Sequence, residues 1–163
     1  MRLRRRPAIE VAPGERLLAW APVRTGTGGE SAAIGGTRDA LYLPQRLPWE
    51  RVASADWDQE ESVLRVVEIA SFGEPTPIHE VHLTDADRLL QLVRERVTAS
   101  IVVQRHVTVT GRKQVRVLAR QAPGSRGEIA WFVEYDDSLD PAAPEVDRIV
   151  QDALADARRD LGG

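Results

Sequence analysis

Two segments of the chain repeat apolar residues at helical spacing, in steps of three and four. The first stripe, between positions 84 and 101, consists of Ala86, Leu89, Leu90, Val93, Val97 and Ile101. The second stripe, between positions 144 and 161, consists of Val146, Ile149, Val150, Ala153, Leu154, Ala157 and Leu161. Both segments are predicted to be amphipathic helices packed on a core. We expect Thr84 to cap the first helix, Asp140 and Pro141 to begin the second, and Gly162 to end it.

The other apolar positions alternate with polar ones, as in half-buried β-strands. Such segments precede the first predicted helix at positions 16–23, 31–36, 37–44, 48–57, 62–70 and 77–83. Three more follow it at positions 102–110, 113–121 and 128–135. Glycine and proline between the segments indicate turns. Short strands at this spacing predict an antiparallel sandwich or barrel in the first part of the chain.

The stretch LPWERVASADWD at positions 47–58, followed by SVLRVVEI, resembles a known pattern. It is similar to the bacterial pleckstrin-homology-like (PH-like) domain, in which an apolar-Pro-Trp start leads into alternating residues, an acidic turn and a further apolar strand. The resemblance covers residues 8–102 and implies a seven-stranded sandwich with one corner capped by a helix. The whole chain also resembles an uncharacterised actinobacterial family with a two-part layout, which implies no activity.

Together these patterns predict an α+β chain in three parts. Residues 1–7 form a flexible basic tail. Residues 8–102 form a PH-like antiparallel β-sandwich or barrel capped by a helix. Residues 103–163 form a three-stranded antiparallel unit with a C-terminal helix.

Composition and charge limit the kinds of function. The chain has 163 residues, a net charge of −3 and no cysteine, which excludes disulfides and cysteine-bound metals. No stretch approaches the roughly 18 apolar residues of a membrane helix, so we expect a cytoplasmic protein, and we expect no cofactor. A lipid headgroup is not an expected ligand, because only Arg24 supplies positive charge in the first hairpin loop. His79 and His82, three apart in a predicted strand, point to opposite faces and do not suggest a shared metal.

Tryptophan and carboxylates cluster between Leu47 and Glu61. Such a cluster can be a sugar platform, a pair of catalytic acids or a cation site, or it can be an ordinary strand and turn. A regular strand over 48–57 places Trp49 and Trp57 on the same side but about 26 Å apart, at about 3.3 Å per residue. The acids then form the solvated end of a hairpin at 58–61. We therefore predict a structural strand.

Positive charge is concentrated between Arg96 and Arg126, where there is no acid. The candidate partner-binding residues in this stretch are Arg105, Arg112, Lys113, Arg116 and Arg120. One interpretation is a basic hairpin that binds nucleic acid or an acidic partner. The other, which we favour, is a basic strand pair that faces the acidic final strand and helix of the same chain.

These patterns favour a non-catalytic protein-interaction or scaffolding module. A PH-like sandwich has an open groove and edge strands that can accept a peptide by strand addition. The partner is then an unidentified protein or a second copy of the chain. Two alternatives stay open: a nucleic-acid-binding protein that uses the basic stretch at 96–126, and an enzyme whose site the sequence does not reveal.

Overall fold

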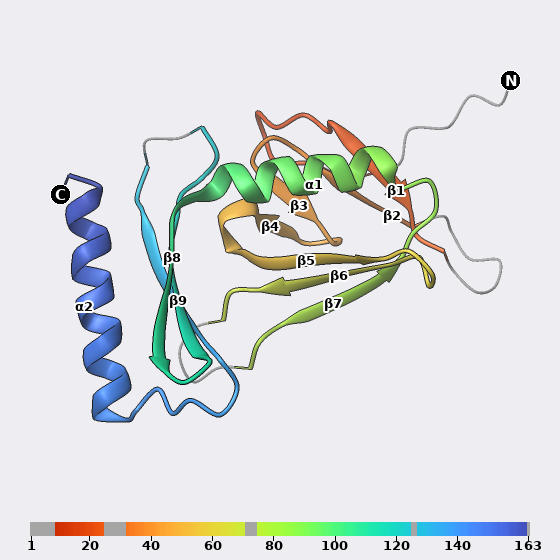
Figure 1. Ribbon diagram of the computed structural model, residues 1–163. Helices are drawn as coiled ribbons and strands as arrows, with labels where there is room; N and C mark the ends of the chain where they lie inside the picture. Colours follow the sequence, from red (N-terminus) through yellow and green to blue (C-terminus); the bar gives the residue numbers. More distant parts are fainter. Residues whose placement is uncertain (1–8, 25–31, 71–74, 125–126, 163) are drawn as a thin grey trace, which may run out of the picture. The chain divides into compact units, whose positions relative to one another are not determined.

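The computed structural model describes residues 9–24, 32–70, 75–124 and 127–162, and Figure 1 shows the chain as a ribbon. The predicted basic tail at 1–7 lies outside the described residues. In the part that is described, the chain is α+β, with two helices and three antiparallel sheets. The predicted fold class is therefore confirmed. No closed barrel forms among the described strands.

The chain divides into two compact units. The first unit comprises residues 1–100 and 122–124, and the second unit comprises residues 101–121 and 125–163. The boundary falls between the first helix and the strand that follows it.

The first unit contains two antiparallel sheets and one helix (Figure 1). The four-stranded sheet consists, in spatial order, of β1 (Ala19–Pro22), β2 (Ala33–Gly36), β3 (Ala40–Tyr42) and β4 (Arg46–Pro48). The three-stranded sheet consists, in spatial order, of β5 (Val52–Asp58), β6 (Val63–Glu68) and β7 (Ile78–His82). The sheets meet where β1 and β7 end, because Val23 forms a β-bridge with Leu83. The helix α1 (Asp87–Ser100) follows β7.

The core of the first unit lies between α1 and the sheets. The predicted stripe of α1 is confirmed for its buried members Leu89, Leu90 and Val93, and Leu92 joins them. Gly36 allows the closest approach, because a Cβ at this position would lie 2.7 Å from Leu92 Cδ2 and 3.1 Å from a ring carbon of Trp49. A side chain there would force the helix and the tryptophan apart.

Two predictions about element boundaries in this unit are wrong. The expected strand at 48–57 is interrupted, because Trp49 opens the 3₁₀ helix η1 (Trp49–Arg51) and β5 begins only at Val52. The helix α1 begins at Asp87, so Thr84 lies before the helix and does not cap it. Asp85 has a φ of 49°, which is not helical, and this conformation delays the start of the helix.

The second unit is a three-stranded antiparallel sheet with one helix, as predicted. Its elements are β8 (Ile101–Thr110), β9 (Lys113–Arg120), β10 (Ala130–Tyr135) and α2 (Pro144–Asp160). Trp131, Val133 and Tyr135, at alternate positions of β10, pack against the core of this unit. From α2 the predicted stripe contributes Val146, Ile149, Val150, Ala153, Leu154 and Ala157.

The ends of the predicted helices differ from the structure in three places. The first proline of α2 is Pro144 and not Pro141, because Asp140 closes a turn by accepting a hydrogen bond from the amide of Ala142. Ile101 begins β8 and Leu161 lies beyond α2, so neither extends a helical stripe. Gly162 follows the helix with a φ of 75°, which confirms its predicted role at the helix end. Neither α1 nor α2 has the length and apolar character needed to cross a bilayer.

Candidate functional site

Strand β5 lies at the edge of its sheet. Among the described residues it pairs with one strand, β6, in an antiparallel register that sets Ala55 opposite Val66 and Trp57 opposite Leu64. On its other side, α1 runs nearby (Figure 1). An edge strand presents backbone N–H and C=O groups that can pair with an added chain.

A small groove separates β5 from α1. Its volume is about 220 Å³, and it is lined by Ala55, Asp56, Trp57, Leu64, Leu90, Val93 and Arg94. We call it the β5–α1 groove. Its floor is apolar, because Leu64, Leu90 and Val93 belong to the buried core. Its rim is charged, with Asp56 exposed on the strand and Arg94 exposed on the helix.

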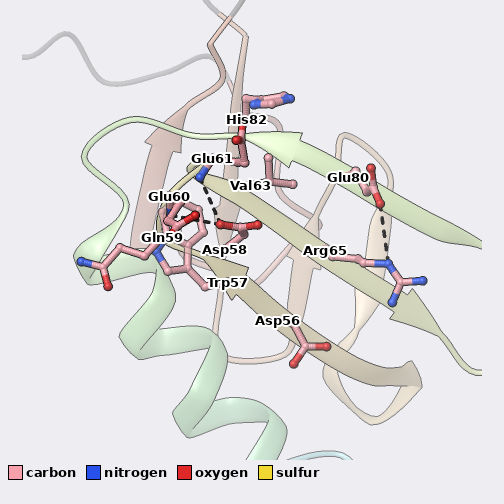
Figure 2. A pocket seen from close by; sticks show the side chains of 10 residues that line it. All are labelled: Asp56, Trp57, Asp58, Gln59, Glu60, Glu61, Val63, Arg65, Glu80 and His82. Atoms are coloured by element: carbon pink, nitrogen blue, oxygen red, sulfur yellow. Dashed lines mark hydrogen bonds and ion pairs between the residues drawn. The ribbon is translucent and has the colours of Figure 1, made fainter.

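A larger, open hollow adjoins the groove at the β5–β6 turn (Figure 2). It occupies about 850 Å³ and is lined by Asp56, Trp57, Asp58, Gln59, Glu60, Glu61, Val63, Arg65, Glu80 and His82. We call it the acidic hollow. Asp56 and Trp57 line both depressions, but the two open on opposite faces of the sheet. Ala55, Trp57 and Leu64 share the face toward α1, whereas Asp56, Asp58 and Arg65 share the other face.

The carboxylates of the acidic hollow have different local roles. Asp58 Oδ1 accepts hydrogen bonds from the amides of Glu60 and Glu61, at 3.0 and 3.1 Å, and so closes the turn. Glu80 forms an ion pair of 3.6 Å with Arg65 (Figure 2). Glu60 and Glu61 are exposed at the tip of the hairpin. The prediction that these acids form the solvated end of a hairpin is confirmed.

The two tryptophans do not share a ligand site. Trp49 is fully buried, and its indole Nε1 donates a hydrogen bond of 2.9 Å to the carbonyl oxygen of Thr37. Trp57 is half-buried, packs on the core and lines the groove and the hollow. The predicted structural strand is right for Trp57, whereas Trp49 lies in η1 and is a core residue.

The predicted basic residues of the second unit do not gather into one patch. Arg105 forms an ion pair with Asp160 of α2. Arg116 donates from Nε to Glu134 of β10 at 2.8 Å. Arg112 and Lys113 are exposed at the β8–β9 turn, and Arg120 is buried. Of the five candidates, Arg105 and Arg116 thus face acids of the final helix and the final strand of their own unit.

The three histidines also do not gather at one place. His79 Nε2 lies 2.6 Å from Glu68 Oε2. His82, the last residue of β7, lines the acidic hollow. His106, on β8, contacts Gln104. The described residues contain no group of three or more histidines, aspartates or glutamates arranged to hold a metal ion.

Sequence reasoning identified the acids and Trp57 but missed the groove beside them. The sequence places Leu90, Val93 and Arg94 in a helix and Ala55 in a strand. It carries no signal that this helix and this strand lie next to each other. Strand order decides which strand is at the edge, and alternation within one strand carries no information about order. Comparison of the chain with protein-family models, with curated proteins and with solved structures gave no match.

Proposed function

We propose that this protein is a non-catalytic interaction module that binds an extended segment of a partner protein by strand addition at β5. The observation that carries this proposal is the β5–α1 groove, where the open edge of a strand meets an apolar floor. In strand addition, backbone hydrogen bonds supply affinity and pockets for alternate side chains supply specificity. The groove offers both elements at the same place.

The size of the groove favours a peptide side chain over a small molecule. Sites for small ligands and cofactors usually occupy about 300–1,000 Å³ and bury most of the ligand. The groove has about 220 Å³, which is below this range. An extended peptide places every second side chain on one face, so a single apolar side chain in the groove can anchor the segment.

The PH-like resemblance of residues 8–102 agrees with this proposal, because it implies a sandwich with a groove and open strand edges. We further propose that the module acts in the cytoplasm as part of an assembly. The absence of cysteine is compatible with that compartment.

The proposal is tested by selecting linear peptides from a random phage-displayed library on the full chain. The selected peptides are then measured against the variant Ala55→Arg, which fills the groove from the strand side. Ala55 is half-buried, lines the groove and packs against the core, so the longer side chain occupies space that the peptide side chain would fill. We expect at least a tenfold loss of affinity, which corresponds to about 1.4 kcal/mol.

The matched control is Ala99→Arg, which introduces the same side chain at an exposed position of α1 outside the groove. It should bind the selected peptides like the wild type. The proposal is wrong if the library yields no specific peptide, or if Ala55→Arg and Ala99→Arg bind equally well. Circular dichroism of both variants establishes that a loss of binding is not a loss of fold.

A further inference from the structure

We infer that the segment bound at β5 is basic, and that its positive residues precede its apolar anchor in the peptide sequence. This inference rests on the proposed function and names the partner class of the same site. The apolar part of the segment occupies the β5–α1 groove, and its basic part occupies the acidic hollow.

The charge of the acidic hollow carries the first step. Its lining includes five carboxylates and one arginine, and that arginine, Arg65, is paired with Glu80. The remaining carboxylates come from Asp56, Asp58, Glu60 and Glu61, all of which are exposed. A depression lined mainly by one sign of charge attracts a ligand of the opposite sign. A segment with arginine or lysine complements it, whereas an acidic segment is repelled.

The alternation of side chains along a strand carries the second step. At Asp56 and Trp57 the groove and the hollow open on opposite faces of the sheet, and a strand added beside these residues points alternate side chains to each face. The half-buried indole of Trp57 offers a face on which an arginine side chain can stack. One extended segment can therefore occupy both places without a turn.

The direction of β5 carries the third step. The strand runs from Val52 to Asp58, and the acidic hollow lies at its Asp58 end. Every pair in this sheet is antiparallel, and antiparallel pairs are the commoner kind in proteins. A segment added antiparallel to β5 enters at the Asp58 end. Its basic residues then stand before its apolar ones.

The test uses synthetic peptides with blocked termini and the full chain, followed by fluorescence anisotropy at about 0.05 and 0.15 M salt. The first peptide has three arginines followed by Val-Thr-Val-Thr-Val. The others replace the arginines by serines, replace them by glutamates, or place the arginines after the apolar part. We expect the first peptide to bind most tightly, the reversed one more weakly, and the acidic one most weakly. The advantage of the first peptide should shrink at the higher salt concentration.

Two variants locate the charge effect. Glu60→Gln with Glu61→Gln removes two acids that are exposed at the hairpin tip, and should weaken the first peptide about three- to tenfold, as expected for two exposed ion pairs. The serine peptide should be unaffected. The control is Glu128→Gln with Asp152→Asn, which makes the same change of charge at exposed positions of the second unit.

The outcomes separate the two proposals. If the arginine, serine and glutamate peptides bind equally and Ala55→Arg abolishes all three, the strand-addition site stands and the basic specificity is wrong. If the control pair weakens the first peptide as much as the hairpin pair does, the effect is one of total charge, and the inference is wrong again. If the reversed peptide binds better, the assigned direction is wrong. If no peptide binds, or Ala55→Arg has no effect, the proposed function itself fails.

Discussion

The carboxylate of Glu15 fixes the segment before β1 to the first sheet. It accepts hydrogen bonds from the hydroxyls of Thr37 and Tyr42, at 2.6 and 3.0 Å, and from Arg46 Nε at 2.8 Å. The side chain of Glu15 is only 7% exposed. Burial by itself raises the pKa of Glu15, but the hydrogen bonds from Thr37, Arg46 and Tyr42 outweigh burial and hold this pKa below its usual value.

The substitution Glu15→Gln should destabilise the protein at neutral pH. Hydrogen bonds to a charged group contribute about 1.5–3 kcal/mol, so we expect a loss of about 2 kcal/mol in the free energy of unfolding. Because the pKa is lower in the folded state, the contribution is fully present above the unfolded value of about 4.5 and is lost as the pH falls through the folded value. The wild type and the variant should therefore converge in strongly acidic solution. Urea unfolding between pH 3 and pH 7 measures this convergence.

The same substitution at the exposed Glu10 serves as the control, and should change stability little at any pH. If the free energy of unfolding differed by the same amount between wild type and Glu15→Gln at every pH, the stabilisation would come from the packing of the Glu15 side chain and not from its charge.

At the scale of elements, periodicity predicted the helices and most strands, whereas boundaries depended on local geometry. The stripe of α2 could be read from the chain because its spacing alone places Val146, Val150 and Leu154 on one face. The interruption of the strand at Trp49 could not be predicted from the local pattern, because the indole of Trp49 donates a hydrogen bond to a backbone carbonyl twelve residues away in sequence. The acids at 58–61 were predictable because they form a local turn, but the groove depends on strand order and on the placement of α1.

The start of α2 offers a prediction at this scale. The residue at its N-cap, Ala143, is extended and forms no side-chain cap hydrogen bond. The backbone N–H groups of the first turn therefore have no side-chain acceptor at the N-cap. The substitution Ala143→Ser supplies a hydroxyl acceptor and should stabilise the protein by about 1 kcal/mol. Thermal and urea unfolding measure the gain. The control is Ala142→Ser, one position outside the cap, which should have little effect; an equal gain from both would rule out capping as the cause.

At the scale of the whole molecule, the described residues form two hydrophobic cores. In the described residues, the core of the first unit gathers side chains from both of its sheets and from α1. The core of the second unit gathers side chains from β8, β9, β10 and α2. No residue of the described part belongs to both cores. The proposed binding surface lies wholly on the first unit, so damage to the core of the second unit should leave peptide binding intact.

The substitution Leu154→Ala tests this independence. Leu154 is buried in the core of the second unit, and truncation of a buried leucine costs about 2–5 kcal/mol. Hydrogen exchange followed by mass spectrometry should show faster exchange in β8, β9, β10 and α2, with little change in β1 to β7 and α1. Leu89→Ala, which truncates a fully buried leucine of the first core, should give the reverse pattern. If either substitution accelerates exchange evenly across both units, the chain unfolds as one cooperative body, and the two cores are not independent sources of stability.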